Sequence, residues 1–356
     1  MHDIRLGIIG YGGMGRYHAK RAPDAGVKVL AAADILPERA AEAQAAGLTG
    51  YCSAGGLLAD DRINTVILTV PNHLHKEMCV KAAEAGKHVI TEKPAALSVS
   101  ELDEMEAACR KAGVVLTAHQ NRRWDRDMLT AKYALDSGII GKIFTIESKL
   151  HSANGYMHEW HLYKKYGGGM MYDWGVHLID QILFMMPRAK IEYIFADIKK
   201  VLHEEVDDYF KILMKMDNGI TAHIELSTYI LDYQPRWLVG GDKGTMIVKD
   251  FACGGAVYKT GKLLEKLPPQ IAETEAGPTR QFAPVPPGGI ITEALPEIQT
   301  DPNEFYRNLR GVINGQGELK VKIPEVRRVL SVMEAAVESS ETGRAIAFEA
   351  CGNINA

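Results

Sequence analysis

Cysteines are few in this sequence and widely spread. The chain of 356 residues contains only five, and no two of them form a CxxC pair: Cys52, Cys79, Cys109, Cys253 and Cys351. This distribution argues against a disulfide framework or a cysteine-rich zinc site. An odd number of scattered thiols is typical of a reduced, cytoplasmic protein.

Long apolar runs and basic runs are absent as well. No stretch approaches the ~18 apolar residues that a membrane span needs. The first residues, MHDIRLGIIGYGG, lack the basic leader and unbroken apolar segment of a secretory signal. The formal net charge is −4, and without a basic cluster the chain lacks the electrostatic footprint of a nucleic-acid-binding protein. We therefore expect a cytoplasmic protein that binds neither membranes nor nucleic acids.

The first third of the chain predicts a parallel sheet covered by helices. Short apolar runs alternate there with amphipathic patterns, an order typical of a doubly wound α/β domain. The expected strands cover residues 4–9, 27–32, 65–70, 88–91 and 114–118. The expected helices cover residues 14–25, 37–46, 74–85 and 98–112, and glycines follow them as C-terminal caps.

The pattern changes after about residue 121. Helices are expected over residues 125–136 and 170–186, together with alternating strands and hairpin turns such as Asp217-Asn218-Gly219. These features predict a second α/β domain with a large open, mostly antiparallel sheet. We expect domains at residues 1–121 and 122–356, with closing helices near 301–311 and 324–342 that can pack back on the first domain.

A glycine-rich loop, LGIIGYGGMG at residues 6–15, lies between a predicted strand and a predicted helix. In that context Gly10-x-Gly12-x-x-Gly15 predicts a dinucleotide site, with a tight turn at Gly10, pyrophosphate close to Gly12, and helix packing at Gly15. The phosphates would face the N–H groups at the helix start, which adds Gly13 and Met14 to the candidate contacts.

Asp34 ends the second predicted strand, 19 residues beyond Gly15. A carboxylate at this place accepts hydrogen bonds from the ribose hydroxyls and repels a 2′-phosphate. Ile35 offers such a phosphate nothing, although Arg39, one turn further, can reach it. NAD is therefore favoured over NADP, with Asp34, Ile35 and Arg39 as candidate contacts.

A second glycine cluster opens the stretch YGGGMMYDWGVHLID, residues 166–180. It places Asp173 and His177 four positions apart on a predicted helix. The same spacing is common on solvated helix faces, so by itself it predicts no site.

Four motifs in order resemble those of the glucose–fructose oxidoreductase/inositol dehydrogenase (Gfo/Idh/MocA) family of NAD(P)-dependent oxidoreductases. They are GYGGMGRYH (10–18), TVPNHLHKE (69–77), EKP (92–94) and DWGVHLID (173–180). The resemblance covers essentially the whole chain. It implies an N-terminal Rossmann domain, a second α/β domain with an open sheet, and a homo-oligomer, dimer or tetramer, formed through that sheet.

The resemblance also implies catalytic residues. Lys93 in EKP would hydrogen-bond the reacting hydroxyl and stabilise alkoxide character, and Pro94 is expected to follow a cis bond. His177 would take the proton of a secondary alcohol. Asp173 would orient the imidazole of His177 or contact substrate hydroxyls.

Supporting roles follow from the same motifs. Asn72 would lie near the nicotinamide, and Glu92 would accept from the nicotinamide ribose. His75 lies in the same segment as Asn72 and is a cofactor candidate, with a structural role favoured. Asn121 and Arg122 are candidate substrate residues in the cleft, although an interdomain ion pair is an equal alternative for Arg122.

Aromatic and hydrogen-bonding residues are concentrated between residues 151 and 174. Tyr156, His158 and Trp160 are candidate substrate contacts, because rings that stack on C–H faces next to hydroxyl-binding groups suit a sugar or a glycoside. His151, His158 and His161 lack the spacing of helical metal ligands, and no metal is expected.

The sequence thus predicts NAD-dependent oxidation of a secondary hydroxyl on a small-molecule cyclic polyol, sugar or glycoside, as by inositol, aldose or glycoside 3-dehydrogenases. Two alternatives stay open. One is an NAD-dependent glycosidase that uses transient oxidation and elimination, and the other is a non-catalytic NAD-responsive regulator.

Overall fold

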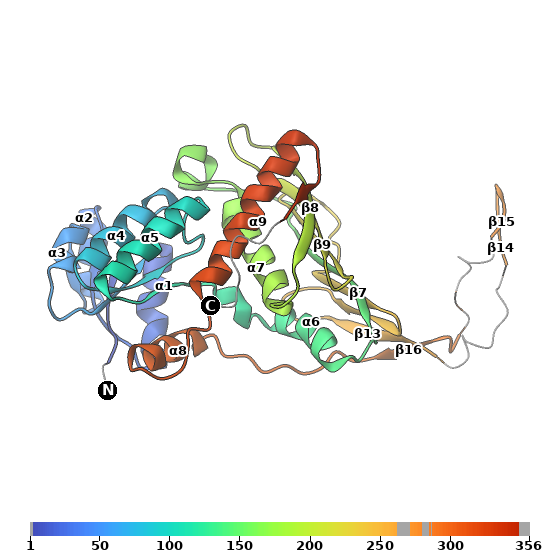
Figure 1. Ribbon diagram of the computed structural model, residues 1–356, viewed down its shortest axis with the longest axis horizontal. Coiled ribbons are helices and arrows are strands. Elements are labelled where there is room, and N and C mark those ends of the chain that lie inside the picture. The colour runs from blue at the N-terminus through green and yellow to red at the C-terminus, as the bar shows by residue number, and fades with distance from the viewer. Residues whose placement is uncertain (1–2, 262–270, 280–284, 286, 349–356) are drawn as a thin grey trace.

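The computed structural model describes residues 3–261, 271–279, 285 and 287–348. Two main sheets organise these residues, and the helices α1 to α5 surround the first of them (Figure 1). None of the described helices has the length and apolar character needed to cross a membrane. The four described cysteines carry free thiols, and Cys351 lies outside the described residues.

The N-terminal sheet has six parallel strands in the order β3-β2-β1-β4-β5-β6, as the alternation of apolar runs and helices predicts. The strands are β1 (Arg5–Ile9), β2 (Lys28–Ala33), β3 (Thr49–Tyr51), β4 (Thr65–Leu68), β5 (His88–Thr91) and β6 (Leu116–Ala118). β4 is buried along its whole length, as expected of a strand covered on both faces. β3 was not expected from the sequence, because its three residues, TGY, contain no apolar run.

The helices beside this sheet are α1 (Gly13–Arg21), α2 (Pro37–Ala45), α3 (Ala54–Leu58), α4 (His75–Glu84) and α5 (Val99–Ala112). Ser98 caps α5, with its Oγ accepting the N–H of Glu101. Gly113 ends the same helix at φ 66°, a left-handed conformation that favours glycine.

The C-terminal sheet has nine strands in the order β16-β13-β12-β11-β7-β10-β9-β8-β17. Its pairs are antiparallel except for the parallel pair of β7 and β10, so the predicted mostly antiparallel sheet is confirmed. The strands are β7 (Ile143–His151), β8 (Ile191–Lys199), β9 (Tyr209–Met216), β10 (Thr221–Ser227), β11 (Trp237–Gly241), β12 (Gly244–Val248), β13 (Gly255–Thr260), β16 (Ile290–Glu293) and β17 (Ile346–Ala347). A separate hairpin joins β14 (Ala272–Thr274) to β15 (Gly277–Thr279).

Four further α-helices follow the N-terminal sheet in the described chain: α6 (Arg126–Ser137), α7 (Val176–Met185), α8 (Glu304–Ile313) and α9 (Ile323–Thr342). α6 packs on β11 and α7 on β10, while α9 contacts β8 and also returns to α5 and β6 (Figure 1). A buried ion cluster lies where they meet: Arg123 pairs with Asp180 at 2.6 Å and with Glu325 at 2.7 Å.

Candidate active site

The glycine loop links β1 to α1 as the sequence predicts. Gly10 has φ +98°, and a Cβ added there would lie 2.6 Å from Thr69 O, so only glycine fits this turn. A Cβ at Gly15 would overlap Gly10 O. Gly12 caps α1 without any side-chain hydrogen bond, and Gly13, Met14 and Gly15 form its first turn. The N–H groups at this helix start are thus available to a pyrophosphate.

A cavity of about 960 Å³ opens beside this loop, and Gly10, Gly12, Asp34, Ile35 and Arg39 line it. Asp34 is held in its wall, because its Oδ2 accepts the N–H of Tyr11 at 2.7 Å and its Oδ1 accepts the N–H of Leu36 at 3.0 Å. Arg39 Nη1 lies 3.5 Å from Asp34 Oδ2. These residues fit the adenosine half of a dinucleotide. Ser53–Gly55, at the start of α3, also line this cavity and were not predicted from the sequence.

Lys93 follows β5 and meets a residue from the second glycine cluster. Its Nζ donates to Asp173 Oδ1 at 2.6 Å and to the backbone O of Asp173 at 2.9 Å. Burial raises the pKa of Asp173, but Lys93 outweighs it and the carboxyl pKa falls below its usual value. The pair therefore brings opposite charges from two distant segments into one partly buried site.

Asp173 lies in a π-helical turn, Met171–Gly175, where the N–H of Val176 bonds to Met171 O. The sequence predicts one continuous helix over residues 170–186, whereas the regular part, α7, begins only at Val176. Such π-helical turns occur often at functional sites. The carboxylate of Asp173 pairs with Lys93, and no hydrogen bond to His177 is seen among the described residues; contact with substrate hydroxyls, the other expected role, stays a prediction.

His177 lies in the first turn of α7 and is only 4% exposed. Its Nδ1 is buried without a hydrogen-bond partner among the described residues, and the Trp174 ring packs edge-on at 5.7 Å. Burial, and then the charges of Lys93 and Arg122, lower the pKa of His177 well below its ordinary value. The imidazole is therefore neutral at neutral pH.

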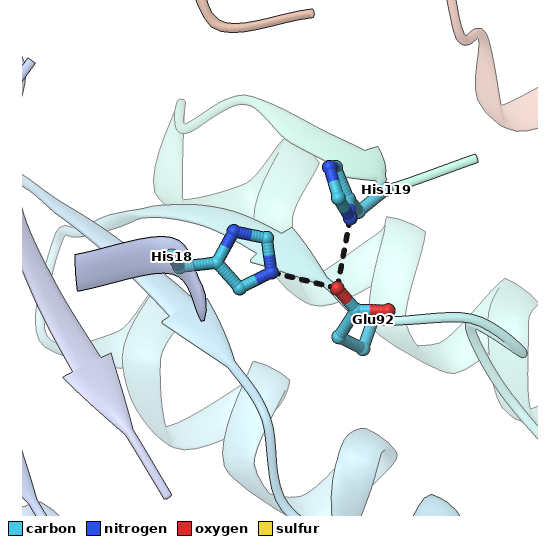
Figure 2. Close-up of side chains that lie close together, drawn as sticks. All are labelled: His18, Glu92 and His119. Atoms are coloured by element: carbon cyan, nitrogen blue, oxygen red, sulfur yellow. Dashed lines mark hydrogen bonds and ion pairs between the residues drawn. The ribbon is translucent and has the colours of Figure 1, made fainter. Parts of the chain in front are cut away.

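Two expected cofactor contacts are corrected by the structure. His75 is fully buried, with its ring nitrogens 2.8 Å from Pro94 O and 3.0 Å from Val70 O, so its role is structural. Glu92 turns inward, where its Oε1 lies 2.7 Å from His18 Nε2 and 2.8 Å from His119 Nδ1 (Figure 2). Its Oε2 accepts the N–H of Lys93 at 3.2 Å. Both carboxylate oxygens are thus engaged within the protein, and the side chain is buried away from any ribose-binding surface, at 5% exposure. The Lys93–Pro94 bond is cis, as expected.

Asn72 is buried and donates from Nδ2 to Gly167 O at 2.9 Å, which joins the N-terminal unit to the second glycine cluster.

Arg122 pairs with Asp125 in the same turn, at 2.9 Å, and its Cζ stacks 4.0 Å from the centre of the Trp174 ring. The alternative of an interdomain ion pair is therefore not seen for Arg122, because both of these contacts lie within residues 122–356. Asn121 precedes Arg122 in this turn and is half-buried.

The aromatic segment lies next to the Lys93–Asp173 pair. Tyr156 stacks on His158 at 5.7 Å, and Trp160 stacks on His161 at 3.8 Å. His158 and His161 lie close enough to Asp173 to lower its carboxyl pKa. The Tyr156 ring remains 69% exposed, so this stack presents an open aromatic surface beside the charged pair.

His151 lies apart, at the end of β7, where its Nδ1 accepts the N–H of Gln234 at 3.3 Å. Among the described residues, the cluster with metal-ligand composition is His18, Glu92 and His119, which the sequence analysis did not identify. His18 follows the glycine loop and His119 follows β6 directly. Their positions along the chain could therefore have marked both histidines as candidate residues near the site. Tyr306, whose hydroxyl bonds to His18, has no local signal.

Comparison with known proteins identifies the family of the chain. Residues 4–120 match the model of the oxidoreductase family with an NAD-binding Rossmann fold, and residues 128–247 match the GFO/IDH/MocA C-terminal domain. A solved NAD-binding protein from Listeria innocua is 37% identical, with a TM-score of 0.93, covering 98% of this chain and 100% of that chain.

Two curated relatives carry names with an activity. The scyllo-inositol 2-dehydrogenase (NADP(+)) of Bacillus subtilis is 29% identical over 301 residues, 82% of this chain and 80% of that protein. The myo-inositol 2-dehydrogenase of Thermotoga maritima is 28% identical over 252 residues, 68% of this chain and 74% of that protein. With both family models matched in order along the chain, this protein belongs to the Gfo/Idh/MocA family and is an NAD-binding oxidoreductase.

Proposed function

We propose that the protein is an NAD-dependent dehydrogenase that oxidises a secondary hydroxyl of a cyclic polyol, sugar or glycoside. The observation that carries this proposal is the Lys93–Asp173 pair beside the neutral His177, whose charge environment includes Lys93. These three side chains supply a hydrogen-bond donor and a proton acceptor at one place. The inositol dehydrogenase names of two relatives agree with a ring polyol as the substrate class.

NAD, when bound, accepts the hydride that leaves the carbinol carbon. The hydroxyl proton goes to the imidazole of His177, because its lowered pKa keeps this ring deprotonated at neutral pH. Lys93 donates to the substrate oxygen and stabilises its negative character as the C=O bond forms. Asp173 holds the Lys93 ammonium in place and provides its counter-charge. One hydride and one proton leave the alcohol, and a carbonyl compound remains.

The cofactor pocket favours NAD over NADP. Asp34 is held with its carboxylate in the wall of the cavity, where it would bind ribose hydroxyls and repel a 2′-phosphate. Arg39 offers a competing attraction for such a phosphate, but it lies 3.5 Å from Asp34 and is partly neutralised by it.

The aromatic stack supports a ring-shaped substrate. The exposed Tyr156 ring and the Trp160–His161 pair lie beside the reacting groups and can cover the C–H face of a sugar. Asn121 and Arg122 are the candidates for hydroxyl contacts from the other side. Exposed apolar side chains on the C-terminal sheet support a homo-oligomer: Phe144 on β7 is 56% exposed and Phe195 on β8 is 45% exposed.

The test is a screen of inositols, aldoses and glycosides, each with NAD and with NADP. The formation of NADH or NADPH is monitored by its absorbance. Lys93→Met and His177→Ala should lower kcat/KM for the true substrate at least about 100-fold. Lys76→Met, which removes a surface lysine paired with Glu104, is the matched control and should leave it unchanged.

Turnover of both site variants within a few-fold of the parent protein would refute the mechanism. Release of sugar from glycosides without accumulation of NADH would identify the glycosidase alternative. NAD binding without turnover of any of these compounds would favour the regulator.

A further inference from the structure

Four side chains from distant parts of the chain form a buried hydrogen-bond network directly behind Lys93. His18 comes from α1, Glu92 follows β5, His119 follows β6 and Tyr306 lies in α8. None of the four is more than 5% exposed. His18 and His119 both point at Glu92 Oε1 (Figure 2), and the Tyr306 hydroxyl lies 2.5 Å from His18 Nδ1.

The residue types suggest a metal site, but the distances do not. Two ligands bound to a zinc ion at 2.0–2.1 Å lie roughly 3.3 Å apart in a tetrahedral site. Here the histidine nitrogens lie only 2.7 and 2.8 Å from the carboxylate oxygen, which are hydrogen-bond lengths. The three groups therefore bind one another and leave no room for an ion between them.

The protons of the network can be assigned consistently. Burial opposes ionisation of Glu92, yet His119 and His18 outweigh it and hold the carboxyl pKa well below its usual value. A carboxylate only accepts, so His18 Nε2 and His119 Nδ1 both donate to it. Burial lowers the pKa of His18 and raises that of Tyr306, so the tyrosine hydroxyl donates to the neutral His18 Nδ1. Each of these bonds has one donor and one acceptor.

This network ends on the reacting lysine. The second oxygen of Glu92, Oε2, accepts the backbone N–H of Lys93 at 3.2 Å. The backbone of Lys93 is thus bonded to Glu92, and the side chain of Lys93 is bonded to Asp173. The charges of Glu92 and His119 also act on the pKa of His177, so the network lies near both reacting groups.

We propose that Glu92, together with His18, His119 and Tyr306, forms a positioning device that sets the backbone of Lys93 so that its amine meets Asp173 and the substrate hydroxyl. Tyr306 connects helix α8 to this device through His18. The inference rests on the proposed function for its kinetic readout only, because the Lys93–Asp173 contact can be observed without any substrate.

The first test compares kinetics of Glu92→Gln and Tyr306→Phe with the parent. A misplacement of about 1 Å can cost on the order of 100-fold in rate, so we expect kcat to fall at least about tenfold in Glu92→Gln and several-fold in Tyr306→Phe. KM for the substrate and Kd for NADH should stay within about threefold. Tyr17→Phe is the matched control, since its ring packs on His18 at 5.3 Å and the structure gives its hydroxyl no bond to the network; its kcat should equal that of the parent.

A second pair of variants separates positioning from general stability. His119→Asn keeps an N–H donor near the place of Nδ1, whereas His119→Leu has none. We expect His119→Asn to recover most of the kcat that His119→Leu loses, even where both lower the melting temperature equally. Equal losses of kcat in the two variants, or losses that follow the melting temperature alone, would overturn the proposal.

The structural test is independent of turnover. Crystal structures of the parent, Tyr306→Phe and Glu92→Gln with NADH should show the Lys93–Asp173 contact intact in the parent and displaced or split between positions in the variants. An unchanged contact in both variants would overturn the positioning role even if the parent oxidises a sugar. A parent that oxidises no cyclic polyol, sugar or glycoside refutes the proposed function, and the crystal structures then decide the positioning role by themselves.

Discussion

Lys93 Nζ and Asp173 Oδ1 lie 2.6 Å apart, although 80 residues of chain separate them. The lysine follows the fifth strand of the N-terminal sheet, and the aspartate belongs to the π-helical turn before α7. The Lys93 side chain is 20% exposed and the Asp173 side chain is 24% exposed. A charged pair that remains accessible between two units of a chain is suited to receive a polar substrate.

Replacing Asp173 by Asn keeps the shape of this side chain and removes its charge. The amine of Lys93 then loses its counter-ion, and its donors are no longer held towards the substrate oxygen. We expect kcat/KM for the substrate to fall about 10- to 100-fold with NADH affinity unchanged, as measured by steady-state kinetics and fluorescence titration. Asp136→Asn, which alters a surface pair with Lys132, serves as the control. Full activity of Asp173→Asn would show that the pair has no role in turnover.

The acid limb of the pH profile reports on His177. Burial, with the charges of Lys93 and Arg122, lowers the pKa of this histidine well below 6.5. A base acts in its deprotonated form, so it remains competent as the pH falls through 6.5. We expect kcat/KM, measured from pH 5 to 8, to stay level across pH 6.5 and to decline only in more acidic solution. A break near pH 6.5, where an ordinary histidine titrates, would contradict this assignment.

Asp34 should determine the choice of cofactor. Asp34→Ser removes the carboxylate that would bind the ribose hydroxyls and leaves Arg39 without its partner at 3.5 Å. We expect KM for NAD to rise about tenfold, equivalent to about 1.4 kcal/mol, and KM for NADP to fall. The exposed Asp24, paired only with Arg21, provides the control Asp24→Ser. An unchanged ratio of kcat/KM for the two cofactors would show that Asp34 does not select between them.

The carboxyl group of Asp207 should make the free energy of unfolding depend on pH. Its Oδ2 accepts the N–H of Met171 at 2.7 Å, at the start of the turn that carries Asp173, and burial raises its pKa from 3.8 to about 6. Because the folded pKa exceeds the unfolded one, the folded state binds more protons between these values. Stability therefore falls as the pH rises from about 4 to about 6, by about 3 kcal/mol in total.

The variant Asp207→Asn cannot ionise and should lack this decline. Urea unfolding of the variant and the parent at pH 4, 5 and 7 measures the difference in free energy of unfolding. We expect this difference to shift in favour of the variant as the pH rises. The same difference at all three pH values would mean that Asp207 titrates normally.

The sequence by itself determined those features that depend on short stretches of chain. The glycines of the first loop are required by a turn and a helix contact within a few residues, as Gly10 at φ +98° shows. The parallel sheet follows from the alternation of apolar strands and helices, and the motif around Lys93 marks the end of one strand.

The tertiary structure alone decided which side chains face one another. Asp173 has His177 four residues away, yet it pairs with Lys93. Glu92 turns from the expected cofactor to His18 and His119, and the hydroxyl behind them comes from Tyr306, 288 residues from His18. Local patterns set backbone conformation, because propensities and caps act over a few residues. The partner of a buried charge is set instead by whatever the packed fold brings within hydrogen-bond reach, and no local pattern contains that information.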